Sequence, residues 1–305
     1  MNIQTYFRAL WLCLALAGTA TAQATFEVIE GDVFTCSSDG SILIGVDNTN
    51  FFILENGVKT YISGSAGLAD LSDDGSVVLG QVPPFSQVSA ATYTASTGWT
   101  SLGGLPGQMS PFDIDSFATE ISKDGTTVVG LGIRTDGRGR GFRWRAATGM
   151  QEMPQLGIYD SQATTVSGDG KWIGGYDETM FNGRRAALWD ENFNETLILL
   201  GVTPNGAGEV HDLNSDGSVA CGRAGAEGFV WTPDGGAVTM GLLPPYTLSR
   251  ALACSDDGKV AVGNASSPPL VIGLATIWTP SDGLQLLEEV LVANGATGIP
   301  NGSLK

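Results

Sequence analysis

Short apolar runs alternate with polar turn residues along this chain, and one arrangement of them returns six times. Each copy has an apolar residue, a Ser or Asn, one further residue, an Asp-Gly pair, and a second Gly five residues after the first, as in the stretch Ile121–Gly130. Two apolar runs separated by Asp-Gly predict a β-hairpin, because Gly supplies the positive φ of a tight turn at little cost. The Ser or Asn side chain can bond the turn backbone.

The spacing of the copies predicts a repeat architecture. The turn pairs lie 35 (Asp39 to Asp74) to 50 (Asp74 to Asp124) residues apart. We interpret all of them as structural turns: Asp39 and Gly40, Asp74 and Gly75, Asp124 and Gly125, Asp169 and Gly170, Asp216 and Gly217, Asp257 and Gly258.

A second pair of strands follows each hairpin, often with a central Trp. The third copy continues with Gly141–Arg145, a turn at Gly149, and Met150–Met153, and the fifth and sixth copies repeat this order. Four strands per unit and six units predict an all-β fold, a β-propeller of about six four-stranded blades. The alternatives are another all-β repeat array, a single large sandwich, or part of a larger propeller.

The pattern apolar-Ser-x-Asp-Gly-x-x-Val-Val-Gly, followed by a Phe-x-Trp strand such as Phe142–Trp144, resembles the HAF-type extracellular repeat family of bacterial exported proteins. The similarity covers about residues 33–290. This chain departs from the family at the third strand, where it has no His-Ala-Phe. The resemblance implies export and a repeat architecture, and it implies no particular activity.

The first 22 residues have a different character. Arg8 precedes the apolar run 9–17, and small residues follow up to Ala22. This is the order of a secretory signal peptide, and the apolar run is shorter than the roughly 20 residues that span a bilayer. We therefore predict a leader (1–22), a single propeller domain (23–305) with repeats beginning near 33, 68, 118, 163, 210 and 251, no membrane span, and a secreted location, either extracellular or periplasmic.

Charge narrows the class of partner. The formal net charge is −17, and loss of Arg8 with the leader makes it −18. An acidic protein is repelled by nucleic-acid phosphates, so we expect no nucleic-acid partner.

The single histidine, His211, excludes a His-rich zinc site and lies in no protease motif. Cys36 and Cys254 share a repeat position that is aliphatic in other copies, and no disulfide framework is predicted.

Carboxylates four residues before the turn Asp remain as candidate functional groups. Asp70, Glu120 and Asp212 hold this position in three copies. If the strand before the turn is innermost, they would stand around the central channel, where oxygen ligands suit Ca²⁺ and paired carboxylates suit acid/base chemistry. We expect an exported, non-catalytic propeller that binds a protein, glycan or surface component. The alternative is a carbohydrate-active hydrolase or lyase that uses these carboxylates.

Overall fold

The computed structural model describes residues 31–83, 88–108, 114–155, 157, 159–179, 183–198, 208–267 and 273–296. The predicted leader lies outside these residues. In the described part of the chain, no helix has the length and apolar character needed to cross a membrane.

The protein is a β-propeller, and its described residues form six four-stranded antiparallel sheets, which we number as blades 1 to 6. Blade 1 comprises β1 (Asp32–Cys36), β2 (Ile42–Asp47), β3 (Asn50–Glu55) and β4 (Val58–Ile62). Blade 2 comprises β5 (Gly67–Leu71), β6 (Val78–Val82), β7 (Ser89–Thr94) and β8 (Gly98–Gly103). Blade 3 comprises β9 (Ser116–Ile121), β10 (Thr127–Ile133), β11 (Gly139–Arg145) and β12 (Gly149–Glu152).

The second half of the chain repeats this order. Blade 4 comprises β13 (Ser161–Val166), β14 (Ile173–Thr179), β15 (Gly183–Trp189) and β16 (Glu195–Leu197). Blade 5 comprises β17 (Gly208–Leu213), β18 (Ala220–Ala224), β19 (Glu227–Thr232) and β20 (Gly236–Gly241). Blade 6 comprises β21 (Leu248–Cys254), β22 (Ala261–Ser266), β23 (Leu274–Thr279) and β24 (Gly283–Leu286), and the short helix α1 (Leu287–Ala293) follows. The run of Leu and Glu over 284–294 favours a helix in place of the last strand, and the structure has both, a strand up to Leu286 and a helix from Leu287 to Ala293.

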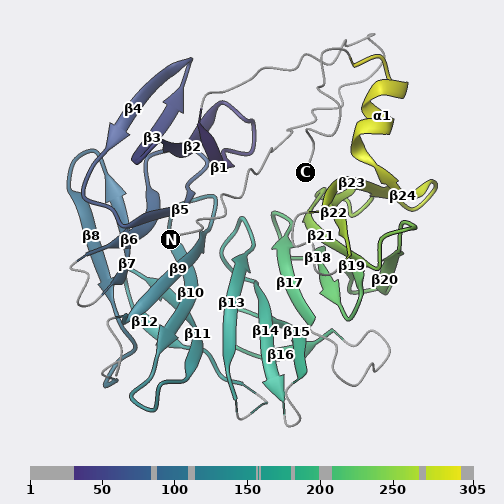
Figure 1. Ribbon diagram of the computed structural model, residues 1–305. Coiled ribbons are helices and arrows are strands. Elements are labelled where there is room, and N and C mark those ends of the chain that lie inside the picture. The colour runs from purple at the N-terminus through teal and green to yellow at the C-terminus, as the bar shows by residue number, and fades with distance from the viewer. Residues whose placement is uncertain are drawn as a thin grey trace, which may run out of the picture.

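The first strand of each blade lies toward the middle of the molecule, and the blades follow one another in an arc from β1 to β24 (Figure 1). Successive first strands pack together, from β1 against β5 to β17 against β21. Among the described residues, no comparable packing joins β21 of blade 6 to β1 of blade 1.

The repeated Asp-Gly pairs form the turns between the first two strands of each blade. In blade 3, Gly125 has a φ of 72° and donates its N–H to the Ser122 carbonyl at 2.8 Å. Ser122 donates to the Asp124 carboxylate at 2.6 Å, and that carboxylate accepts the Thr126 N–H at 3.0 Å. The first Gly of every copy has a φ between 66° and 76°, a region that favours glycine.

The second Gly of each copy faces a β-bulge in the first strand. Gly130 pairs with Ala118, while its neighbour Val129 pairs with Glu120, so Thr119 is the extra residue. A Cβ on Gly130 would lie 2.0 Å from the Phe117 carbonyl oxygen. The same register shift occurs in all six blades, opposite Gly45, Gly80, Gly130, Gly175, Gly222 and Gly263. Glycine is therefore required here by the close approach of the neighbouring strand.

Candidate functional site

The bulges place two adjacent side chains of one blade against the backbone of the next blade. We call the extra residue of each bulge, five residues before the turn Asp, the donor position. The residue after it is the acceptor position. In a regular strand these two side chains would point to opposite faces of the sheet, and the bulge re-aims them.

The three predicted carboxylates occupy the acceptor position and bind backbone N–H groups of the following blade. Asp70 of blade 2 accepts the Ile121 N–H at 3.1 Å. Glu120 of blade 3 accepts the Val166 N–H at 3.0 Å, and Asp212 of blade 5 accepts the Cys254 N–H at 2.8 Å. The structure thus gives each of these carboxylates a blade-to-blade hydrogen bond.

Side chains at the donor position complete the contact by reaching a carbonyl of the next blade. Thr119 donates to the Ala163 carbonyl at 2.9 Å, and Thr164 donates to the Val210 carbonyl. His211 Nδ1 lies 2.7 Å from the Ala251 carbonyl oxygen. In blade 2 the position holds alanine, and Gln81 from the second strand reaches the Ala118 carbonyl instead, at 3.2 Å. Four consecutive junctions therefore share one kind of hydrogen bond.

Burial makes the carboxyl groups at the acceptor positions hard to ionise. Desolvation raises the pKa of Asp70 to about 7 and that of Asp212 to about 6. The pKa of Glu120 is raised well above its usual range by burial and then by the charges of Asp70 and Asp212. The charge of one of these groups thus affects the ionisation of another, although they belong to different blades. Such a cluster of perturbed carboxyl groups marks a functional-site candidate, although structural networks produce it too.

His211 belongs to the same network. Burial lowers its pKa, although the nearby Glu209 carboxylate, whose Oε2 lies 3.9 Å from Nε2, acts in the opposite direction. A neutral imidazole with Nδ1 protonated donates to the Ala251 carbonyl. The histidine thus has a positioning contact between blades 5 and 6.

The turn aspartates have the opposite electrostatic character. Hydrogen bonds from Ser41 hold the pKa of Asp39 at about 2, and the backbone N–H of Lys259 is the main cause that holds the pKa of Asp257 at about 2. These carboxylates are ionised and bonded within their own turns. Their geometry is explained by the turn.

The turns also meet one another at one end of the channel. The Ser38 N–H donates to the Asp73 carboxylate at 2.7 Å, and the Ser215 N–H donates to the Asp256 carboxylate at 2.9 Å. Lys123 of blade 3 reaches past blade 4 to the Ser215 hydroxyl at 3.0 Å. Polar contacts therefore join turns of different blades, and the charge of Lys123 acts to lower the pKa of Asp212 against the larger effect of burial.

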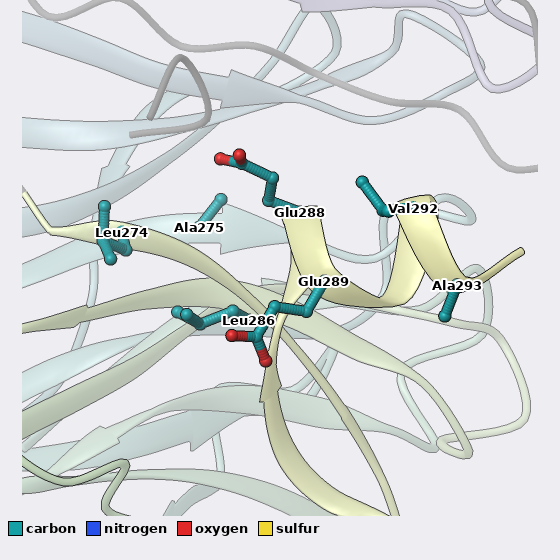
Figure 2. A pocket seen from close by; sticks show the side chains of 7 residues that line it. All are labelled: Leu274, Ala275, Leu286, Glu288, Glu289, Val292 and Ala293. Atoms are coloured by element: carbon teal, nitrogen blue, oxygen red, sulfur yellow. The ribbon is translucent and has the colours of Figure 1, made fainter. Parts of the chain in front are cut away.

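A separate groove lies beside α1, away from these junctions. It has a volume of about 450 Å³ and is lined mainly by apolar side chains of β23, β24 and α1, including Leu274, Leu286 and Val292. Figure 2 shows Glu288 and Glu289 projecting from the start of α1 at its border. None of the three predicted carboxylates lines it.

The second Gly of each copy indicates a bend in a strand or a close backbone approach, and the bulges lie opposite it. Sequence reasoning missed the donor positions and one further cluster. Asp212, Cys221 and Cys254 each offer a ligand atom, and these atoms all lie within 4.8 Å of one another. The fixed offset of the second Gly was a usable signal for the bulge, because a glycine opposite a strand marks a close backbone approach. No sequence spacing identifies the cluster, since it spans two blades.

Comparison with known proteins supports the fold. No family model matches the sequence, and no curated protein matches it. A prolyl endopeptidase structure aligns with a TM-score of 0.59 and 14% identity, over 83% of this chain and 41% of that protein. An oligogalacturonate lyase in complex with manganese aligns at 0.55 and 16%, over 84% and 77%. A functionally unknown protein from Desulfotomaculum acetoxidans aligns at 0.50 and 14%, over 88% and 89%. At these identities the likeness shows the fold alone.

Proposed function

We propose that this protein is an exported, non-catalytic propeller scaffold that binds an extended segment of a partner protein along the outer edge of blade 1. The scaffold part of the proposal rests on the junctions, where the polar groups repeated around the channel hold one blade to the next. Export rests on the leader-like residues 1–22 and on the resemblance to the HAF-type family.

The observation that carries the binding proposal is the exposure of β4. This strand is the last in its sheet, so within the described part of the chain no strand pairs with its outer edge. Val58 is 65% exposed and Tyr61 is 56% exposed, and they are the two most exposed large apolar side chains on the strands among the described residues. An unpaired edge with apolar side chains is a template for an added strand, which is a common mode of peptide recognition.

Neighbouring side chains fix the polar side of this edge. Lys59 forms an ion pair with Asp47 at 3.0 Å, and its ammonium lies 4.4 Å from the centre of the Phe52 ring. Tyr61 also donates to the Asp47 carboxylate, at 3.3 Å. Val58 and Tyr61 are three residues apart and lie on opposite faces of the sheet, so an added strand would contact one on each face.

The test is a peptide selection with matched variants. A random peptide library is selected on the purified chain, and the binding peptides are titrated by calorimetry against the parent, Val58→Lys with Tyr61→Lys, and Thr100→Lys with Ser101→Lys. The last pair changes two exposed residues at the corresponding outer strand β8 of blade 2. A peptide that binds by adding a backbone hydrogen-bond ladder to β4 depends on that edge. We therefore expect its binding to weaken by about tenfold or more in the β4 variant and to stay unchanged in the β8 variant. Equal binding by all three proteins would reject the site.

A second candidate function is carbohydrate hydrolysis or elimination by the carboxyl groups at the acceptor positions. The raised pKa of Asp70, about 7, beside Glu120 and Asp212 favours this reading, because a general acid works best with a pKa near the operating pH. Asp70→Asn, Glu120→Gln and Asp212→Asn keep an acceptor oxygen for the next blade. A panel of polysaccharides would show activity in the parent and its loss in folded single variants. A parent inactive on the whole panel would leave the scaffold as the function.

A further inference from the structure

The junction between blades 5 and 6 differs from the others in a pair of side chains beside the acceptor position. One lies on the second strand of the earlier blade, five residues after the turn Asp, and the other on the first strand of the later blade, three residues before it. At three junctions the pair is aliphatic and packs in the core: Ile44 with Leu71, Leu79 with Ile121, and Val129 with Val166. At the junction of blades 5 and 6 the pair is Cys221 and Cys254.

Both cysteines are free thiols, and Asp212 completes the cluster. Cys221 is fully buried on β18, and Cys254 lies on β21. The Asp212 carboxylate sits against the same pair, held by the Cys254 N–H at 2.8 Å. The two sulfur atoms and a carboxylate oxygen lie within 4.8 Å of one another. At the junctions after blades 2 and 3, the carboxyl residues Asp70 and Glu120 are accompanied by aliphatic pairs. At the junction after blade 5, cysteines replace both members of the pair, so sulfur and oxygen ligands come together only beside Asp212 among these three junctions.

We propose that Asp212, Cys221 and Cys254 form a binding site for a thiophilic divalent cation of the zinc type at the junction of blades 5 and 6. Two thiolates and a carboxylate supply three of the four ligands of a tetrahedral site and leave one position for water or a ligand. Calcium and magnesium prefer sites made only of oxygen ligands. This site therefore differs in chemistry from a set of oxygen ligands alone, such as Asp70, Glu120 and Asp212 would offer to Ca²⁺.

Cation binding here would join two blades. The three ligands come from β17, β18 and β21, so the cation would link strands of blade 5 to the first strand of blade 6. Coordination requires both thiols to be deprotonated, so each bound cation displaces two thiol protons and binding strengthens as pH rises. No electron transfer is involved.

The experiment is a cobalt titration of the purified, reduced full chain. Co²⁺ bound by thiolates gives a sulfur-to-cobalt charge-transfer band, and Zn²⁺ should displace it. We expect one equivalent of Co²⁺ per chain in the parent. Cys221→Val and Cys254→Ile, which copy residues used at other junctions, should lose the band. Asp212→Asn should keep a weaker band, with affinity lowered about tenfold or more by the loss of one anionic ligand.

Cys36 is the matched control. In blade 1 it occupies the repeat position that Cys254 occupies in blade 6, and it is not part of the cluster. Cys36→Val should bind Co²⁺ as the parent does. Zn²⁺ should raise the melting temperature of the parent and of Cys36→Val, but not that of the double variant Cys221→Val with Cys254→Ile. Absence of the band in the parent, or its survival in both cysteine variants, would overturn the proposal. So would a Cys221–Cys254 disulfide in the untreated chain that reforms in the presence of Zn²⁺.

Discussion

Blade 3 and blade 6 have the same bulge but different side chains on it. In blade 3 the donor and acceptor positions hold Thr119 and Glu120, which bind the Ala163 carbonyl and the Val166 N–H of blade 4. In blade 6 the same positions hold Leu252, which is 39% exposed, and an alanine. Blade 3 is followed by another blade in the arc (Figure 1), whereas among the described residues no blade packs in the same way against β21 of blade 6.

The difference separates two roles that the repeat combines. The bulge itself belongs to the hairpin, since both blades keep the glycine that faces it and the same register shift. The polar side chains belong to the junction, since Thr119, Glu120 and His211 each contact the backbone of the following blade. Blade 1 is also followed by a blade, but its donor position holds Phe34. A buried backbone group must find a partner, and at these junctions the polar side chains supply it.

The largest expected effect comes from adding a side chain to the glycine that faces the bulge. Gly130→Ala in blade 3 would place a Cβ 2.0 Å from the Phe117 carbonyl oxygen, and Gly263→Ala in blade 6 would place one 1.8 Å from the Arg250 carbonyl oxygen. Overpacking of this kind costs about 3 kcal/mol or more when backbone must move. Urea unfolding should show a loss of this size for both variants.

Gly149→Ala is the control for these two variants. Gly149 has a φ of 68° with open space around it, so the substitution strains the backbone without a clash. We expect a cost of about 1 kcal/mol. If Gly130→Ala cost no more than Gly149→Ala, the bulge would not depend on close approach.

The second effect is a pH dependence of stability caused by the half-buried carboxyl groups at the acceptor positions. Asp70 has a folded pKa of about 7 and an ordinary value of 3.8, so between pH 4 and 7 the folded chain holds a proton that the unfolded chain has lost. This group therefore makes stability fall as pH rises through that window, by up to about 1.4 kcal/mol per pH unit. Asp212 and Glu120 act in the same direction, and the lowered pKa of His211 acts against them.

Asp70→Asn isolates the contribution of one carboxyl group. The amide oxygen can still accept the Ile121 N–H, and no charge can form. We expect the variant to gain about 2 kcal/mol relative to the parent between pH 5 and 6.5, given about 1.4 kcal/mol per pH unit. Unfolding free energies measured at both pH values test this, and parallel pH profiles of the two proteins would contradict it.

A third effect isolates the hydrogen bond at the acceptor position. Glu120→Gln and Glu120→Ala both remove the charge, but only glutamine keeps an oxygen for the Val166 N–H. The alanine variant should be less stable than the glutamine variant by about 1–3 kcal/mol, because a buried donor is left without a partner. Chemical unfolding at one pH measures the difference. Equal stabilities would show that water or a rearranged side chain replaces the contact.

The hairpin repeat could be predicted from the sequence because its signals are local. An Asp-Gly pair between apolar runs specifies its own turn, and six copies at similar spacing specify a row of blades. That Asp70, Glu120 and Asp212 share one position in their blades also followed from the repeat. Their use as acceptors for the next blade did not, because it depends on a bulge that breaks the alternation of the strand. The Cys221–Cys254 pair depends on contact between blades and has no signature in either repeat alone.

The smallest expected effect tests whether the comparison with blade 6 is right. Ala253→Asp places a carboxylate at the acceptor position of blade 6, where the described residues show no following blade packed against β21. A charge that stays in water changes the free energy of unfolding by less than about 0.5 kcal/mol. If blade 1 instead lay against blade 6 in solution, the new carboxylate would meet backbone N–H groups of β1, as Glu120 meets those of β13. A gain of about 1 kcal/mol, the net value of such a hydrogen bond, would then be measured by urea unfolding. That gain would show that blades 6 and 1 close the ring. An unchanged stability supports an open sixth blade, in which Leu252 and Ala253 make no contact with a following blade.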